Sequence, residues 1–242
     1  MELSRSVIEA RICAPYGSAM DIKGSIALVT GGNRGIGRHF VQQLLDRGAA
    51  KVYAAARDPR TVDVPGATPL ALDITDPDSV AAAAAVSTDL TLLVNNAGTA
   101  TGNDLVAGDL AAVRQEFDTN FYGPLAMIRA FAPILARNGG GGILNVNSRM
   151  SWLSYPGLNA YAASKAAAWS MTNGVRLELA GQGTQVTGLY LSSTDTDMMA
   201  GWDIPKNDPS DVVSVALDGL VAGAPEVLAD QETKDTRASL AA

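Results

Sequence analysis

From Ile22 onward, short apolar runs alternate with longer segments in which apolar residues recur every three or four positions. Short runs bounded by glycine or polar residues predict β-strands, whereas the longer spacing predicts amphipathic helices. The predicted strands span residues 26–30, 51–55, 68–72, 91–94, 142–146, 185–190 and 226–228. The predicted helices fall at 35–48, 76–85, two segments within 108–137, 159–181 and 209–221. This alternation predicts an α/β fold: a Rossmann-type, doubly wound parallel sheet of about seven strands with helices on both faces.

The beginning of the chain does not share this pattern. Residues 1–20 contain scattered charges and no continuous apolar run of the kind found in a signal peptide. We expect a leader or a disordered extension over residues 1–20 and a single domain over residues 21–242. No run of 18 or more apolar residues is present, so no membrane partner is expected. A cytoplasmic, reducing compartment is the expected location.

Composition excludes several classes of function. The 242 residues include 18 basic and 25 acidic side chains, a formal net charge of −7. Nucleic acid is therefore not an expected partner, because phosphate contacts need a basic surface. The single cysteine and single histidine exclude an internal disulfide and any zinc site built on several such ligands, so no metal is expected. We interpret His39 as structural or exposed, and Cys13 lies in the expected leader.

A glycine-rich turn follows the first predicted strand and opens the first predicted helix. Backbone N–H groups at such a helix N-terminus bind pyrophosphate, and glycine lets a phosphate approach the backbone closely. The alternative is a tight turn that needs glycine for packing alone, but the strand before it and the helix after it favour a dinucleotide. The residues expected to bind it are Gly31, Asn33, Arg34, Gly35, Ile36 and Gly37.

The end of the second predicted strand distinguishes the two nicotinamide dinucleotides. An acidic residue there would bind the ribose 2′-hydroxyl of NAD. This chain has Ala56 followed by Arg57, and Arg34 in the glycine-rich turn supplies a second cation. A guanidinium pairs well with a 2′-phosphate. NADP(H) is therefore the expected cofactor, with an ion pair between Arg57 and Asp58 as the alternative use of that arginine.

A tyrosine and a lysine lie four residues apart in the helix predicted at 159–181, which puts Tyr161 and Lys165 on one helix face. A phenol ionises near pH 10, and a neighbouring ammonium lowers its pKa. We therefore expect Tyr161 to exchange a proton with a substrate. Ser148, just after the fifth predicted strand, can donate to the same substrate oxygen and stabilise negative charge on it. The hydride itself would come from a coenzyme.

Four motifs, in this order and in this strand context, resemble the short-chain dehydrogenase/reductase family over about residues 22–230. They are the glycine-rich turn at 30–37, Asn-Asn-Ala-Gly at 95–98, Ser148, and Tyr-Ala-Ala-Ser-Lys at 161–165. The resemblance implies that Tyr161 is the catalytic acid/base and that Lys165 lowers its pKa and holds the nicotinamide ribose. It also implies that Ser148 polarises the carbonyl. Asn120 would support a proton-relay water beside Lys165.

The resemblance extends along the rest of the cofactor. Asp73 would hydrogen-bond the adenine, and the small residues after the fourth strand would let the cofactor pass. The cofactor-binding residues expected beyond the glycine-rich turn are Arg57, Asp73, Ile74, Asn96, Ala97, Gly98, Tyr161, Lys165, Thr194 and Thr196.

One departure from the family concerns the loop after the sixth predicted strand. The family usually has Pro-Gly there, and this chain has Leu191 and Ser192. Loss of proline raises the conformational entropy of the loop, and loss of glycine disfavours a positive φ angle. The expected consequences are low activity, or a loop that becomes ordered only with ligand.

Large apolar side chains follow Ser148 and Thr196 and suggest an apolar pocket. The substrate-binding candidates are Ser148, Met150, Trp152, Tyr155, Met198 and Trp202. The alternative is that the apolar members pack in the core or between subunits. The expected partner is a fairly apolar carbonyl or alcohol of small size. The resemblance also implies a homodimer or homotetramer.

Taken together, these features predict an NADP(H)-dependent oxidoreductase of the carbonyl reductase or alcohol dehydrogenase type. Hydride would pass between the nicotinamide and a carbonyl or secondary alcohol, with a site of Asn120, Ser148, Tyr161 and Lys165. One alternative is a non-catalytic NADP-binding sensor or scaffold on the same fold, supported mainly by the altered loop. A second alternative, a dehydratase or epimerase of the same family, is disfavoured because little chain follows Leu228.

Overall fold

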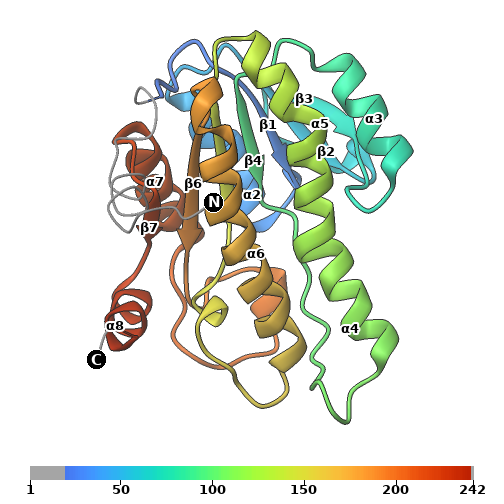
Figure 1. Ribbon diagram of the computed structural model, residues 1–242, viewed down its shortest axis with the longest axis vertical. Helices are drawn as coiled ribbons and strands as arrows, with labels where there is room; N and C mark the ends of the chain where they lie inside the picture. The colour runs from blue at the N-terminus through green and yellow to red at the C-terminus, as the bar shows by residue number, and fades with distance from the viewer. Residues whose placement is uncertain (1–19, 241–242) are drawn as a thin grey trace, which may run out of the picture.

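The computed structural model describes residues 20–240. A seven-stranded parallel sheet forms its centre, with the strand order β3-β2-β1-β4-β5-β6-β7 (Figure 1). The order reverses between β1 and β4, and ligands of such sheets bind at the carboxyl ends of the strands beside this point. The predicted doubly wound α/β fold is confirmed. The strands are β1 Ile26–Thr30, β2 Lys51–Ala56, β3 Thr68–Ala71, β4 Leu92–Asn95, β5 Gly142–Val146, β6 Gln185–Tyr190 and β7 Glu226–Leu228.

The central strands bury apolar side chains on both faces. Along β1, Ala27 and Val29 pack into one core, and Leu28 packs into the other. Helices α2 and α7 contribute to the first core, and α3, α5 and α6 contribute to the second. This two-sided burial explains why continuous apolar runs identify the strands. The helices are α2 Gly35–Asp46, α3 Pro77–Val86, α4 Leu110–Phe117, α5 Gly123–Arg137, α6 Asn159–Leu179, α7 Pro209–Val221 and α8 Gln231–Ser239.

Two helical features were not predicted. A five-residue π-turn, Asp118–Tyr122, joins α4 to α5, so the two expected segments form one continuous helical path. Near the C-terminus, α8 has a mostly polar sequence without an apolar stripe. Its first turn is held by Asp230, whose Oδ1 accepts from the backbone N–H of Thr233 at 2.8 Å. A side-chain cap of this kind stabilises a helix that hydrophobic periodicity does not reveal.

The first described residue, Met20, is already part of the packed domain. Its side chain is buried, and its backbone N–H donates to Gln185 Oε1 at 3.3 Å. Packing therefore begins before Ile22, where the apolar pattern starts. The expected leader over residues 1–20 is therefore one residue too long, since Met20 is packed. The rest of that expectation, residues 1–19, lies outside the described residues. Within residues 20–240, no helix is both long enough and apolar enough to cross a membrane.

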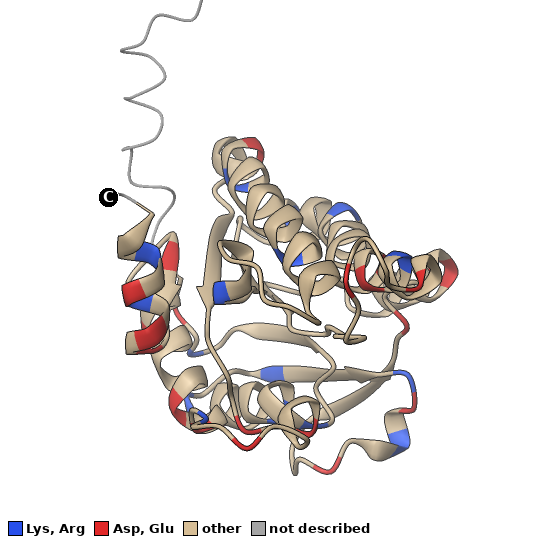
Figure 2. Cartoon of the chain, turned by 90° about the horizontal axis from the view of Figure 1, so that it is seen from below, with Lys and Arg blue, Asp and Glu red and all other residues tan. Residues whose placement is uncertain are grey.

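Charged residues lie mainly on the helices and loops around the sheet, with acidic and basic residues interspersed in the view of Figure 2. Several form ion pairs at the surface, such as Arg38 with Asp63 at 2.8 Å and Arg47 with Asp218 at 2.6 Å. Pairs of this kind contribute little to the free energy of unfolding. The stability of the fold therefore depends mainly on the two apolar cores.

Candidate active site

The glycine-rich turn leads from the carboxyl end of β1 into α2. Gly31 and Gly35 have φ angles of 64° and 51°, in the left-handed region that favours glycine. A Cβ atom on Gly37 would overlap the carbonyl oxygen of Gly31, so no larger residue fits there without displacing the turn. The turn therefore presents bare backbone at the N-terminus of α2, a geometry suited to pyrophosphate.

The segment after β4 braces this turn. The Asn96 side chain donates to the carbonyl oxygen of Thr30 at 2.9 Å. In return, Thr30 Oγ1 accepts from the backbone N–H groups of Asn96 and Ala97, both at 2.9 Å. Gly98 is exposed, and a Cβ atom added to it would lie 3.2 Å from Asn120 Oδ1. Asn96 thus has a structural role in the turn, and cofactor contact by these residues stays a prediction.

Arg57 follows the last residue of β2 and is exposed. The alternative use of Arg57, an ion pair with Asp58, is wrong. Asp58 pairs with Arg60 instead, through two contacts of 2.9 Å. Hydrogen bonds from the Thr75 side chain and backbone are the main cause of the lowered pKa of Asp73, and the charge of Arg57 adds to it. Arg57 and Asp73 thus lie near each other at the β2 end of the site.

The other side chains of the turn already have protein partners. Arg34 forms an exposed ion pair with Asp197 at 3.4 Å, and Asn33 Nδ2 donates to Thr61 Oγ1 at 3.0 Å. Arg34 is therefore a weaker candidate than Arg57 for binding a phosphate. Ile36 and Ile74, two apolar residues expected to bind the cofactor, turn their side chains to the interior instead. Ile36 packs against the first core, and Ile74 is part of the second.

Ser148, Tyr161 and Lys165 converge where β5 ends and α6 begins. Ser148 is buried, caps a short 3₁₀ helix that follows β5, and hydrogen-bonds to the phenol of Tyr161. One turn further along α6, Lys165 Nζ lies 5.7 Å from the ring centre of Tyr161 and donates to the Val146 carbonyl oxygen at 2.9 Å. The structure thus brings together the three residues that the sequence singled out for proton transfer.

The pKa of Tyr161 does not follow the expectation. Burial of the phenol raises this pKa to about 12, with a smaller lowering by the hydrogen bond from Ser148 and a further rise from the charge of Glu116. The expected lowering by Lys165 is wrong for the polypeptide alone, because Nζ bonds the Val146 carbonyl and burial lowers the pKa of Lys165 to about 8. Tyr161 is therefore a protonated phenol at neutral pH.

Asn120 is buried in the π-turn between α4 and α5. Its amide donates to the Thr99 carbonyl oxygen and to Ser164 Oγ, both at 2.9 Å, and accepts from the Thr99 N–H at 2.9 Å. The side chain thus ties the loop after β4 to α6. A cavity of about 10 Å³ lies beside Asn120 and Lys165, which is room for about one water. A relay water at this position stays a prediction.

The loop after β6 runs along the site. At one end, the Leu191 carbonyl oxygen accepts from the backbone N–H of Arg149 at 2.9 Å. At the other end, a Cβ atom on Gly35 would lie 3.3 Å from Thr196 Cγ2. No described residue other than glycine has a positive φ angle, so Ser192 adopts an ordinary backbone conformation. The loop therefore does not use the positive φ angle that a glycine at position 192 would favour.

The candidate substrate residues fall into two groups. Three of them expose large apolar surfaces: Tyr155 at 53%, Met198 at 48% and Trp202 at 42%. By contrast, Trp152 stacks on Tyr190 with ring centres 4.5 Å apart, and the Arg237 guanidinium lies 5.3 Å from its ring. Met150 is partly buried. Packing against β6 and α8 therefore accounts for Trp152, and substrate contact by the others stays a prediction.

Sequence reasoning missed Glu116, a fully buried acid on α4. Its Oε1 accepts from the Thr101 hydroxyl at 2.6 Å, and its Oε2 has no hydrogen-bond partner within residues 20–240. Its charge also raises the pKa of Tyr161. Glu116 lies four residues after Ala112 on the partly buried stripe of α4. The position of Glu116 on this stripe could have indicated from the sequence that it is buried. Its proximity to Tyr161 could not be found in this way.

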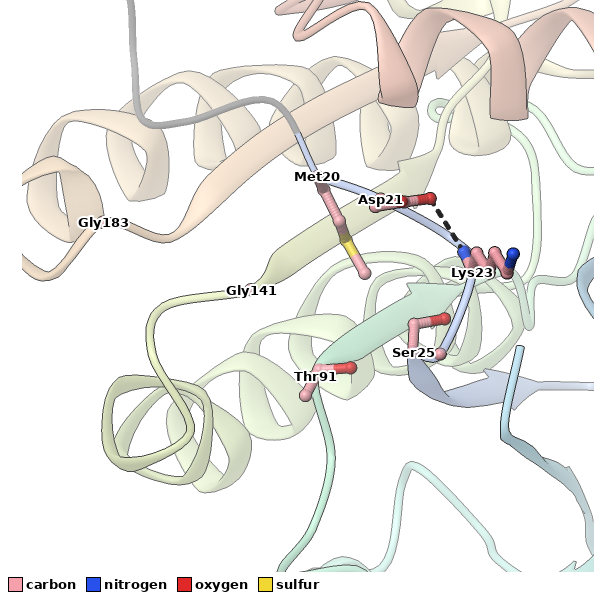
Figure 3. Close-up of a pocket in the computed structure, with 8 residues that line it drawn as sticks. Met20, Asp21, Lys23, Ser25, Thr91, Gly141 and Gly183 are labelled. Carbon is pink, nitrogen blue, oxygen red and sulfur yellow. Dashed lines mark hydrogen bonds between the residues drawn. The ribbon is translucent and has the colours of Figure 1, made fainter. Parts of the chain in front are cut away.

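A separate hollow of about 290 Å³ lies at the amino ends of the strands, away from the candidate site (Figure 3). Its lining includes Met20, Ser25, Thr91 and Gly141, which precede β1, β4 and β5. None of the predicted site residues lines it. Parallel α/β sheets bind their ligands at the carboxyl ends of the strands, so the hollow is distinct from the candidate site.

Comparisons with known proteins agree with this geometry. The family model for short chain dehydrogenases matches residues 25–207. A crystal structure of a short chain dehydrogenase from Burkholderia cenocepacia J2315, in complex with NADP, is 38% identical to this chain. The match covers 92% of this chain and 95% of that one, with a TM-score of 0.89. The protein belongs to the short chain dehydrogenase family.

Two relatives illustrate the range of similar sequences. The short chain dehydrogenase pigC of Monascus ruber is 31% identical over 76% of this chain and 67% of its own length. The NADPH-dependent 1-acyldihydroxyacetone phosphate reductase of Schizosaccharomyces pombe is 35% identical over 72% of this chain. The match covers 61% of the latter protein, so more than a third of its length lies outside the match.

Proposed function

We propose that this protein is an NADP(H)-dependent oxidoreductase that transfers hydride between the nicotinamide and a fairly apolar carbonyl or secondary alcohol. The observation that carries the proposal is the convergence of Ser148, Tyr161 and Lys165 on the sheet edge that holds the glycine-rich turn. Family membership supports oxidoreductase chemistry. The similar Burkholderia structure, in complex with NADP, supports the choice of cofactor.

The described residues fit an NADP-type cofactor. The turn leaves the N-terminus of α2 bare, because side chains are missing at Gly31, Gly35 and Gly37, and this geometry would hold the pyrophosphate. Arg57, at the end of β2, would pair with the 2′-phosphate. Asp73 would accept from the adenine. When bound, the nicotinamide supplies or accepts the hydride.

Tyr161 would move the proton. Its raised pKa keeps the hydroxyl protonated at neutral pH, so it can donate to a carbonyl oxygen as negative charge develops there. Ser148, which hydrogen-bonds to Tyr161, would turn its single hydroxyl proton to the same oxygen when the substrate binds. Lys165 would add positive charge to the site below its pKa of about 8.

A panel of ketones tests the proposal together with the role of Arg57. The wild-type protein is expected to oxidise NADPH far more efficiently than NADH. Arg57→Ala should raise the KM for NADPH roughly tenfold and leave that for NADH unchanged, since an exposed charged hydrogen bond is lost only with the 2′-phosphate. Absorbance of the reduced nicotinamide measures both.

Arg60→Ala is the matched control for Arg57, because Arg60 is also exposed and already pairs with Asp58. It should leave the preference for NADPH intact. Equal changes of both KM values in Arg57→Ala would reject the 2′-phosphate assignment. NADPH binding without oxidation by any ketone would favour the sensor or scaffold.

The two pKa shifts predict opposite pH profiles for the two reaction directions. Carbonyl reduction should fall as the pH rises through about 8, because Lys165 then loses its charge while Tyr161, with a pKa of about 12, stays protonated. Alcohol oxidation should rise with pH, since the phenol must first lose its proton. Values of kcat/KM in both directions between about pH 6 and pH 10 would show this. A reduction rate that increases above pH 8 would contradict it.

A further inference from the structure

Asp230 links the C-terminal helix α8 to the loop after β6. Its Oδ2 accepts from the backbone N–H of Ser192 at 2.9 Å and from Asn207 Nδ2 at 3.2 Å. Its Oδ1 accepts from the Thr233 N–H at 2.8 Å and so caps α8. Burial raises the pKa of Asp230, but the hydrogen bonds from Ser192 and Thr233 outweigh it, and the pKa lies below its ordinary value. One ionised carboxylate therefore holds both the helix and the loop.

Asn207 holds the same loop from a second side. Its Nδ2 also donates to Ser192 Oγ and to the Ser193 carbonyl oxygen, both at 3.0 Å. Its backbone N–H donates to the Ser193 carbonyl oxygen at 2.8 Å. Asn207 also forms an isolated parallel β-bridge with Thr194. Thr194 itself is buried and donates to the Ser192 carbonyl oxygen at 3.2 Å. The middle of the loop is thus fixed by protein groups alone.

The loop at 191–196 runs from the catalytic serine to the glycine-rich turn, the two places that a bound cofactor would have to connect. Its first residue, Leu191, lies beside the catalytic serine, because the Ser148 Oγ is 3.5 Å from the Leu191 carbonyl oxygen. Its last residue, Thr196, lies against Gly35 of the glycine-rich turn. A dinucleotide with its pyrophosphate at the turn and its reactive end at Ser148 would run along this loop. The nicotinamide half would therefore meet the segment that Asp230 holds.

Helix α8 also supports the other side of the site. Glu232 forms an ion pair with Arg149, the residue after Ser148. Arg237 lies 5.3 Å from the ring centre of Trp152, in the segment that follows. The helix therefore contacts both the loop after β6 and the catalytic serine segment, and Asp230 is its contact with the loop.

We propose that Asp230 is a positioning residue that sets the place of the nicotinamide half of the cofactor by fixing the loop at 191–196. The proposal rests on the NADP(H)-dependent function proposed above. Asp230 acts through the Ser192 N–H and does not touch the reacting atoms. Charge-assisted hydrogen bonds are stronger than neutral ones, so a carboxylate at this place holds the loop better than an amide would.

Asp230→Asn tests the proposal with little change in size. Asparagine is a good helix cap, but with its oxygen on the Thr233 N–H its Nδ2 would oppose two donors, the Ser192 N–H and the Asn207 amide. We expect the Kd for NADPH to rise roughly tenfold and kcat to fall by a similar factor, since small displacements of a reacting group are costly. The Kd for adenosine 2′,5′-bisphosphate, which lacks the nicotinamide, should not change. Calorimetric titrations with both compounds measure this difference.

Asp76→Ala is the matched control, because Asp76 also caps a helix, α3, through the Asp78 N–H and has no contact with the loop. It should lower the Tm and leave both Kd values unchanged. Asn207→Ala removes the second anchor without removing a helix cap, and it replaces Asp230→Asn if that variant does not fold. It should weaken NADPH binding selectively as well.

The outcomes separate this proposal from the cofactor assignment. Equal weakening of NADPH and of adenosine 2′,5′-bisphosphate would show a general structural role and overturn the proposal. Unchanged binding of both compounds, with unchanged kcat, would overturn it too. If the wild-type protein binds neither compound, the NADP(H) assignment itself fails, and the positioning role fails with it.

Discussion

Replacing Tyr161 with phenylalanine is expected to abolish carbonyl reduction while NADPH binding persists. The change removes one hydroxyl from a largely buried ring and leaves its packing on α6 intact. That hydroxyl is the acid in the proposed mechanism; its pKa is about 12, and it is bonded to Ser148. General acids contribute roughly 10²–10⁴-fold to turnover, so kcat should fall by about three orders of magnitude. Single-turnover oxidation of NADPH measures the loss.

A second phenol provides the control for Tyr161. The Tyr53 hydroxyl accepts from Lys51 at 2.6 Å and donates to Asp89 at 3.1 Å. These groups lie toward the amino end of β2, and the candidate site lies at the carboxyl ends of the strands. Tyr53→Phe should lose about 1–3 kcal/mol of stability, as expected for these two hydrogen bonds, and keep its kcat. Turnover retained in Tyr161→Phe would reject the proposed mechanism.

The second large effect is expected at Gly37 in the glycine-rich turn. In Gly37→Ala the new methyl group would overlap the Gly31 carbonyl oxygen and crowd Asn96 Nδ2, the two groups that define the turn. Overpacking of a rigid site costs about 1–3 kcal/mol, and backbone contacts put this case at the upper end. We expect a fall of about 3 kcal/mol in the free energy of unfolding and the loss of NADPH binding.

Gly174→Ala makes the same chemical change in a place without crowding. Gly174 lies inside α6, and an added Cβ atom would meet nothing within 4 Å. Alanine in a helix is favoured over glycine by about 1 kcal/mol, so this variant should be more stable than the wild-type protein. Thermal unfolding with and without NADPH compares the two variants. A Gly37→Ala protein that keeps its Tm and its stabilisation by NADPH would contradict the assignment of the glycine-rich turn as the pyrophosphate site.

Much of the sheet could be predicted almost residue by residue because its central strands are buried on both faces. Strands β1, β5, β6 and β7 begin and end as the apolar runs predict, at 26–30, 142–146, 185–190 and 226–228. Helix α8 could not be predicted, because it depends on the Asp230 cap and on contacts with Trp152 rather than on an apolar stripe. The contact between Arg237 and Trp152 joins segments far apart in the chain.

The candidate site divides in the same way. Tyr161 and Lys165 are recognisable because a helix brings residues four apart to one face, and Gly37 because its neighbours form a continuous motif. The direction of the Tyr161 pKa shift was wrong, since burial and the charge of Glu116 depend on how α4 packs against α6. Asp230 was missed for the same reason: it meets Ser192 only in the folded chain.

Transfer of deuterium from NADPH labelled at nicotinamide C4 tests the central claim most directly. With a ketone that the protein reduces, the label should appear on the carbinol carbon of the product, and Tyr161→Phe should form no labelled product. Mass spectrometry of the alcohol reads the label. Unlabelled alcohol from NADPH labelled on both C4 positions, or label that comes from deuterated solvent instead, would contradict hydride transfer at this site.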